Sequence, residues 1–344
     1  MNQNKKIQET LNKIAELVNE AVDPQGAKES GANADSSTDS QNIGCSIRML
    51  PPRLHVKAAE TAVKINPVNA PLMEHMMQLG AEMPSDPQFL TLLTSKYWGP
   101  APRRLTVSFM EVVPVALRTK IIGHMNAWNR TACISFVYTT GVGQVRISLR
   151  GSGYWSYLGT DVLLIPRDRP TMNLQGFSLG TSDREFTRVV RHETGHTLGF
   201  PHEHMRREIV NRIDPIKAYD YFWRTQGWNR ATVDAQVLTP LDPTKIIGTA
   251  ADQTSIMCYQ LPASITRDGR PILGGIDINA TDYAFAGRIY PKPGHNTDSS
   301  HQQGVQSSEE NEWSEAEDVP EEEIEQVIQS MLYESNGTQA ESYA

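Results

Sequence analysis

The stretch RHETGHTLGFPHEH, residues 191–204, decides the fold of this chain. His192 and His196 are four residues apart, so a helix places both imidazoles on one face, one turn apart. Two imidazoles in that arrangement can hold a single Zn²⁺ ion. Glu193 is rotated by about 100° around the helix axis, which takes its carboxylate out of the ligand positions but leaves it within reach of a metal-activated water.

A glycine and a third histidine make this pattern more specific. Gly199 can adopt a positive φ and end the helix sharply, so that His202 returns as a third ligand. Three protein nitrogens leave the fourth position of the metal to water, which is typical of a catalytic rather than a structural zinc. We therefore expect one Zn²⁺ ion bound by His192, His196 and His202, with Glu193 as the general base.

Composition and charge exclude several classes of protein. Of the 344 residues, 39% are hydrophobic and 21% are charged, as in soluble globular proteins. No apolar run approaches the ~20 residues that cross a bilayer, so we expect no membrane span. The net charge of −8 argues against a general nucleic-acid binder. We expect a monomer without a nucleic-acid partner.

The N-terminus and the cysteines bear on where the chain works. Residues 1–22 contain charged residues but no continuous apolar core, so they do not predict a secretory signal. The expectation is a cytoplasmic protein or one exported by a leaderless route. Cys45, Cys133 and Cys258 are too few and too scattered for a disulfide framework, and we interpret all three as reduced thiols.

Periodicity and turn residues predict a mixture of strands and helices from about residue 98 onward. Strands are predicted at 105–110, 134–139 and 145–150, and helices at 115–130, 183–198, 215–224, 230–238 and 280–289. Residues 45–97 are expected to be mostly helical but irregular, because prolines interrupt them. The pattern thus places the first two histidines on a helix that begins near Ser182 or Asp183.

Two motifs resemble those of a known protease family. The string 192–203 resembles the long zinc signature of the metzincin proteases, and Phe200 and Glu203 make it similar to the astacin family in particular. Downstream, SIMCY (255–259) resembles the methionine turn of that family. The resemblance covers about residues 96–292, and both motifs within it are specific.

The resemblance implies roles for individual residues. Met257 would form an apolar floor beneath the zinc, and the Tyr259 phenol would be a displaceable zinc ligand that stabilises the transition state. In the family, Glu203 reaches the new N-terminus after propeptide removal; a local salt bridge is the alternative reading here. His204, two residues past the third ligand, is interpreted as facing solvent.

The resemblance also implies a fold and an activity. The expected fold is α+β and metzincin-type, with a twisted mixed sheet and helices in an upper lobe, an irregular lower lobe, and the zinc in the cleft between. A protein or peptide substrate would lie along a rim strand near residues 155–165. The implied activity is that of a zinc-dependent metalloendopeptidase, with Glu193 and Tyr259 as catalytic residues. The alternative is a zinc-binding, non-proteolytic interaction or scaffold protein.

On this basis the chain divides into four segments. Residues 1–44 are expected to form an amphipathic helix and a disordered linker, and residues 45–95 a helical pro- or regulatory region. Residues 96–293 would be the astacin-like catalytic domain. Residues 294–344 form an acidic tail that is predicted to be disordered. Whether residues 1–95 are a removed propeptide, a regulatory region or a structural extension stays open.

Three features depart from the family pattern. The family usually pairs a cysteine at the position of Cys133 with one just after the last helix, but YPKPG follows here. That disulfide cannot form, which fits a reduced compartment or a bacterial-type member. Cys258 replaces the usual histidine of the methionine turn and is interpreted as a small buried residue. The family's aspartate-switch motif, F-x-G-D, is not found upstream.

Cys45 leaves a further question about latency. Its thiolate could cap the zinc, as in the cysteine switch of a related family. The surrounding sequence, IGCSIRML, does not resemble that motif. We therefore interpret Cys45 as an inert thiol.

Overall fold

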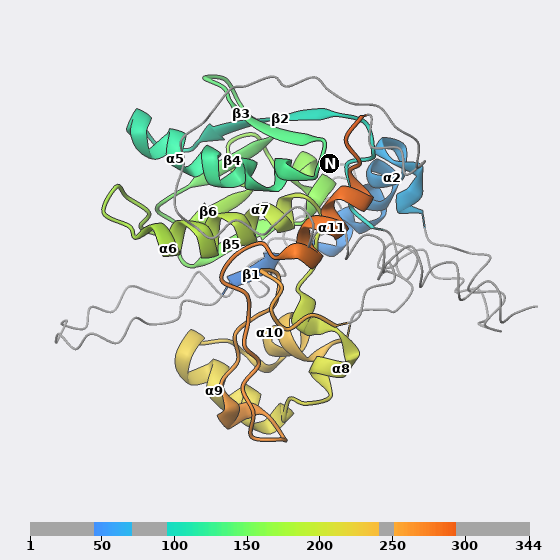
Figure 1. Cartoon of the computed structure of the whole chain (residues 1–344), viewed down its shortest axis with the longest axis vertical. Coiled ribbons are helices and arrows are strands. Elements are labelled where there is room, and N and C mark those ends of the chain that lie inside the picture. Colours follow the sequence, from blue (N-terminus) through green and yellow to red (C-terminus); the bar gives the residue numbers. More distant parts are fainter. Residues whose placement is uncertain (1–44, 71–94, 241–250, 294–344) are drawn as a thin grey trace, which may run out of the picture. The chain divides into compact units, whose positions relative to one another are not determined.

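The computed structural model describes residues 45–70, 95–240 and 251–293. The segments 1–44 and 294–344, for which a helix with a linker and an acidic tail are predicted, lie outside the described residues. The described ranges contain a six-stranded sheet with the strand order β1-β5-β6-β4-β2-β3 (Figure 1). No helix in these ranges is long and apolar enough to cross a membrane.

The sheet is mixed, as the predicted α+β fold requires. Its strands are β1 (Cys45–Arg48), β2 (Arg103–Phe109), β3 (Ile134–Tyr138), β4 (Val145–Ser148), β5 (Tyr154–Tyr157) and β6 (Met172–Leu174). All neighbouring strands are parallel except β5 and β6. The three strands predicted from periodicity are β2, β3 and β4.

Strand β1 corrects the expectation that its part of the chain is helical. Cys45 and Ile47 are buried and alternate with half-buried residues, which is the period of two that a strand produces. β1 pairs in parallel with β5 along its whole length (Figure 1). Helix α2 (His55–Ile65) agrees with the expectation, and residues 71–94 lie outside the described residues.

The rim of the sheet is shorter than predicted. The rim strand is predicted near residues 155–165, but β5 ends at Tyr157. Residues 159–164 form a 3₁₀ helix instead of more strand. Without β1, β5 would be the edge strand of this sheet. The Arg48 guanidinium stacks 4.2 Å from the centre of the Trp155 ring, so β1 also covers an aromatic side chain of β5.

The other described α-helices correspond to predicted ones, except α8, which the sequence patterns do not predict. They are α5 (Val115–Met125), α6 (Asp183–Glu185), α7 (Arg191–Thr197), α8 (Arg207–Val210), α9 (Pro215–Gln226), α10 (Arg230–Val233) and α11 (Ala280–Ile289). The predicted helix at 183–198 is present as α6, a π-helical turn at Phe186–Val190, and α7. Gly199 has a φ of 96° and ends it, as expected. π-helical turns often occur at functional sites.

Two hydrophobic clusters correspond to the two predicted lobes. The larger lies between the sheet and helices α5, α7 and α11. Two tryptophans of this cluster brace α7: the Trp98 indole donates to the Thr197 carbonyl at 2.8 Å, and the Trp128 indole to the Arg191 carbonyl at 2.8 Å. The second cluster lies among α8, α9, α10 and the segment around Leu261. The two indole hydrogen bonds tie the zinc helix to the first cluster.

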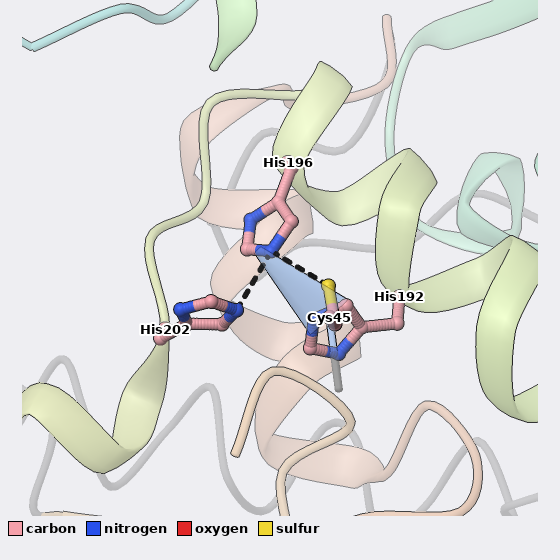
Figure 2. Close-up of side chains that lie close together, drawn as sticks. All are labelled: Cys45, His192, His196 and His202. Carbon is pink, nitrogen blue, oxygen red and sulfur yellow. Dashed lines mark hydrogen bonds between the residues drawn. The ribbon is translucent and has the colours of Figure 1, made fainter. Parts of the chain in front are cut away.

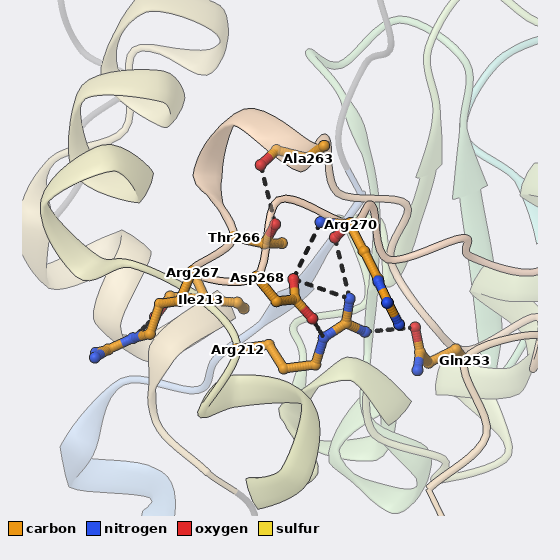
Figure 3. A network of polar contacts seen from close by, with 8 residues as sticks. All are labelled: Arg212, Ile213, Gln253, Ala263, Thr266, Arg267, Asp268 and Arg270. Atoms are coloured by element: carbon orange, nitrogen blue, oxygen red, sulfur yellow. Dashed lines mark hydrogen bonds and ion pairs between the residues drawn. The ribbon is translucent and has the colours of Figure 1, made fainter.

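Arg212 organises the second lobe (Figure 3). Its guanidinium donates to Asp268 at 2.7 and 3.4 Å, to Gln253 at 2.8 Å and to the Arg270 carbonyl at 3.0 Å. The Arg212 carbonyl in turn accepts the Arg267 N–H at 2.7 Å. These bonds tie the segment 251–270, which contains the expected methionine turn, to the chain that follows the third histidine.

Candidate metal centre and active site

Three histidines and a cysteine gather at the end of α7 (Figure 2). His192 and His196 come from α7, and His202 comes from the segment that follows Gly199. Each of the three, together with Cys45, offers one ligand atom, and the four atoms all lie within 4.8 Å of one another. All four residues are buried. The structure therefore brings together the three predicted ligands and adds a fourth residue.

The protonation of the histidines fits a metal ion. His192 Nδ1 donates to the Ile256 carbonyl at 2.6 Å, and His196 Nδ1 donates to the Phe200 carbonyl at 2.8 Å, which leaves the Nε2 lone pairs for the site. Burial lowers the pKa of His192 to about 4 and the pKa of His196 well below its ordinary value. Burial lowers the pKa of His202 likewise. Three neutral imidazoles are the donor set that suits Zn²⁺.

Cys45 Sγ lies where a fourth ligand would be. It donates to Glu193 Oε1 at 2.7 Å and lies 3.7 Å from His196 Nε2. Burial and the Glu193 carboxylate raise the pKa of the Cys45 thiol, so the thiol is the neutral donor in this contact. A cation bound at the site would reverse that preference, because a coordinating thiol loses its proton. The sequence predicts an inert thiol at Cys45, whereas the structure places it among the three candidate ligands.

Glu193 points into the same group of side chains. Its Oε1 accepts the Cys45 thiol, and its Oε2 is buried and has no hydrogen-bond partner among the described residues. Burial raises the pKa of Glu193 to about 8, although the Cys45 hydrogen bond and Arg188 act in the opposite direction. A carboxyl group with a raised pKa beside a metal site can both accept and return a proton near neutral pH.

A comparison with known protein families assigns this site. The model of the peptidase family Astacin matches residues 93–270, more than half of the chain. The chain belongs to the astacin family. The predicted resemblance is thus confirmed, and with it the metzincin-type fold and a site for one zinc ion.

Individual relatives agree with the astacin assignment. Zinc metalloproteinase nas-27 of Caenorhabditis elegans is 33% identical over 99 residues, which cover 29% of this chain and 21% of that protein. Tolloid-like protein 2 of Homo sapiens is 25% identical over 228 residues, 58% of this chain and 21% of that protein. The chain thus spans about a fifth of the length of these relatives. A solved structure of myroilysin matches with a TM-score of 0.54 and 32% identity, covering 58% of this chain and 96% of that one.

The astacin methionine turn lies directly under the zinc helix. Met257 is buried, and its Sδ would be 2.3 Å from a Cβ added at Gly195. The sulfur therefore packs against the one turn of α7 that separates His192 from His196. This packing agrees with the apolar floor that the family resemblance implies for Met257. It also requires glycine at position 195.

Tyr259 lies beside His202 at the metal centre. Its hydroxyl donates to the Cys45 carbonyl, and its ring meets the His202 ring edge-on with the centres 5.3 Å apart. Burial raises the pKa of Tyr259 well above its ordinary value, so the phenol is protonated and acts as a donor. In this arrangement the Tyr259 hydroxyl holds the backbone of β1.

Predictions for three further residues near the site can be compared with the structure. Glu203 forms an ion pair with Arg206 at 2.9 Å and accepts the Asp252 N–H at 3.2 Å, so the local salt bridge is the arrangement seen here. The prediction that His204 faces solvent is wrong, because its side chain is fully buried. Cys258 is buried, as expected.

Sequence reasoning set aside a zinc-capping role for Cys45 and placed His204 in solvent, for different reasons. Cys45 lies 148 residues from Glu193, and no local spacing relates the two. The apolar-polar alternation of CSIR could have indicated a strand, but four residues are too few to argue from alone. His204 gives no such signal, because its burial depends on a π-helical turn more than 30 residues later.

Proposed function

We propose that this chain is a zinc-dependent metalloendopeptidase that Cys45 and strand β1 hold in a latent state. The observation that carries the proposal is the buried group of three neutral imidazoles with the free Oε2 of Glu193 beside it. A metal ion, a general base and a phenol donor are the three components that hydrolysis of a peptide bond needs.

Each residue has a defined part in the proposed reaction. His192, His196 and His202 would hold the zinc ion, which supplies Lewis acidity toward a water molecule and a peptide carbonyl. Glu193 accepts the proton of the attacking water and then passes it to the leaving amine. The Tyr259 hydroxyl donates to the developing oxyanion, as it donates to the Cys45 carbonyl in the latent form.

The fourth ligand raises the alternative of a closed, structural zinc site. Four protein ligands are typical of structural zinc, and such a site would suit a non-proteolytic scaffold. Two observations favour a latent enzyme instead. Cys45 comes from a separate strand laid along β5 and not from the fold around the histidines. Glu193 and Tyr259, which a structural site does not need, both contact that strand.

Strand β1 explains how latency works. Cys45 Sγ takes the position that the attacking water requires, and β1 covers the edge of β5 with which an extended substrate would pair. We propose that the substrate is a protein or peptide. We also propose a monomer without a nucleic-acid partner, which the net charge of −8 supports. A cytoplasmic or leaderless-export location stays a prediction from the sequence.

Glu193→Gln tests the proposed activity. The amide cannot accept a proton, so we expect kcat to fall by about 10²–10⁴-fold while the chain keeps one zinc ion. Cleavage of casein or a quenched peptide library measures the activity, and metal analysis measures the zinc. Wild-type cleavage must also stop with a chelator and return with Zn²⁺. Turnover similar to wild type in Glu193→Gln would refute the assignment.

Cys45→Ala tests the proposed latency. Removing the sulfur removes one proposed zinc ligand. If the closed state of β1 becomes less stable by about 1.4 kcal/mol, the population of the open state rises tenfold. We therefore expect about tenfold higher peptidase activity from the intact chain. With Co²⁺ in place of zinc, the thiolate-to-cobalt charge-transfer band should be present in the wild type and absent in the variant.

Cys133→Ala is the matched control for this test. Cys133 is also a buried free thiol, but its Sγ contacts the Pro100 carbonyl at 3.4 Å and not the metal centre. The control should change neither the activity nor the cobalt spectrum. Equal activity in wild type and Cys45→Ala, with the cobalt band retained, would show that Cys45 is not a ligand.

A further inference from the structure

The side chain of Gln236 forms hydrogen bonds with both backbone polar groups of one residue of β1. Gln236 lies in the π-helical turn Asp234–Leu238 and is 8% exposed. Its Oε1 accepts the Ile47 N–H at 3.1 Å, and its Nε2 donates to the Ile47 carbonyl at 3.0 Å. Both bonds go to the backbone, so neither depends on the isoleucine side chain. A single carboxamide thus satisfies one whole residue of an extended chain.

A second contact lies on the same edge of β1. In an extended strand, successive residues direct their backbone groups to opposite edges. The Ile47 groups therefore face away from β5, and so does the Cys45 carbonyl two residues earlier, which accepts the Tyr259 hydroxyl. A chain extended along β5 is thus bound on its other edge by Tyr259 and, two residues on, by Gln236.

His204 fixes these two contacts relative to each other. Its Nε2 donates to the Gln236 backbone carbonyl at 2.9 Å, and its Nδ1 accepts the Tyr259 N–H at 3.4 Å. One imidazole tautomer satisfies both bonds. Gln236 and Tyr259 are therefore held in one arrangement by a buried side chain that is neither a ligand nor a base, which gives the histidine next to the metal centre a function.

Gln236 needs a new partner when β1 leaves. A buried carboxamide that has lost its donor and its acceptor is costly to leave unsatisfied. An extended peptide paired with β5 offers the same N–H and carbonyl, and rotating the amide by 180° accommodates a chain of either direction. This points to a use of Gln236 beyond latency.

We propose that Gln236 is a substrate-binding residue. Its carboxamide takes both backbone hydrogen bonds of the substrate residue two positions from the one whose carbonyl contacts the Tyr259 hydroxyl. This inference rests on the proposed peptidase function and extends it to the substrate. The substrate residue at that position must have a backbone N–H, so proline is excluded there.

The test uses the full chain with Cys45→Ala and Ile47→Pro, which remove the sulfur and the N–H that hold β1 in place. The probe is the synthetic peptide IGCSIRML, residues 43–50, added to this opened chain. Two further copies are N-methylated, one at the position of Ile47 and one at the position of Ser46. Calorimetry measures their binding, and metal analysis confirms one zinc ion per chain.

The binding results should show that Gln236 acts on one backbone position of the peptide, that of Ile47. Gln236→Ala should weaken the unmodified peptide about tenfold, and N-methylation at the Ile47 position should weaken it similarly. Gln236→Ala and N-methylation at the Ile47 position together should weaken binding no more than either change alone. N-methylation at the Ser46 position, which faces β5, should weaken binding by the same factor with or without Gln236.

Gln253→Ala is the control variant. Gln253 lies in the same lobe, and its side chain accepts from Arg212 at 2.8 Å and not from β1. This variant should bind all three peptides as the opened chain does. If Gln236→Ala also binds all three unchanged, or loses the same factor for every peptide, the proposal is wrong.

Cleavage tests the same residue in catalysis. With a quenched peptide derived from a casein cleavage site, Gln236→Ala in the opened chain should lower kcat/KM about 10-fold or more, with zinc content unchanged. A scan of N-methylated substrates should find one position whose sensitivity disappears with Gln236. Peptide binding that depends on Gln236 without chelator-sensitive cleavage would refute the peptidase function and leave the backbone contact standing.

Discussion

At the scale of the residue, Gly195 shows how closely the zinc helix is packed. A Cβ at this position would be 2.3 Å from Met257 Sδ and 3.2 Å from the Trp128 ring. We predict that Gly195→Ala costs about 1–3 kcal/mol of folding free energy, because the sulfur or the helix must move. It should also weaken zinc binding, since the displaced turn separates His192 from His196. Denaturant titration and competition with a zinc chelator measure the two effects.

Gly123→Ala is the matched control on another helix. Gly123 lies in α5, and a Cβ added there meets nothing within 4 Å. In that open space alanine should stabilise the chain by up to about 1 kcal/mol and leave zinc affinity unchanged. We expect the two alanine variants to change the folding free energy in opposite directions. A neutral Gly195→Ala would mean that the methionine does not support the helix.

The same scale shows which site residues a sequence can reveal. His192, Glu193, Gly199 and His202 lie within one short stretch, so helix geometry alone relates them. Met257 and Tyr259 were found only through the family resemblance. Gln236 was missed because a residue 189 positions away completes its contacts, and no periodic pattern joins the two.

At the scale of the element, helix α11 anchors the methionine turn through its first turn. Asp282 accepts the Ser255 hydroxyl at 2.6 Å and the Ile256 N–H at 2.9 Å, and it completes a capping box with Asn279. The Ile256 carbonyl in turn orients His192. One carboxylate therefore connects the last helix to His192, a proposed zinc ligand.

Asp282→Ala should therefore affect both stability and metal binding. It leaves buried donors unsatisfied and removes part of a cap, for an expected loss of about 2–3 kcal/mol. Zinc affinity should fall about tenfold, because the partner of His192 Nδ1 loses its support. Asp214→Ala removes the N-cap of α9 in the second lobe and should cost about 1 kcal/mol without affecting zinc. Equal effects of the two variants on zinc would contradict the connection.

Sequence patterns predicted these elements unequally. Helices α5 and α11 span ten or more positions, which is long enough for a pattern to stand out. Strands β1 and β6 have four and three residues, too few for a pattern to stand out. Their strand conformation depends on the ladder that β5 and β4 provide, and such long-range pairing leaves no local signal.

At the scale of the whole molecule, the metal centre joins segments that are far apart in sequence. Of the proposed ligands, Cys45 comes from β1, two histidines come from α7, and His202 comes from the chain that leads to the second lobe. A metal that binds only the folded chain at a concentration of 1,000 Kd stabilises it by about 4 kcal/mol. We predict that chelation lowers the melting temperature by roughly 10 °C and that added Zn²⁺ restores it.

Calorimetry of the holo and chelated chain measures this effect. His202→Ala should melt near the chelated wild type and respond little to zinc. Alkylation of the Cys45 thiol should also accelerate after chelation, because the strand loses its metal contact. An unchanged melting temperature in a sample shown to be metal-free would contradict the role of zinc in holding these segments together.

The short connection between β1 and α2 has a consequence for the kinetics of activation. While residues 49–54 are intact, Cys45 is presented to the zinc at an effective concentration of millimolar order. Met49 is 59% exposed, whereas Leu50 is buried against α2, so one cut between them would release the strand and leave the helix docked. At micromolar chain concentration, return of the strand would then be about 10³-fold less favourable. A single hydrolysis would thus make activation a one-way step without weakening any contact in the site itself.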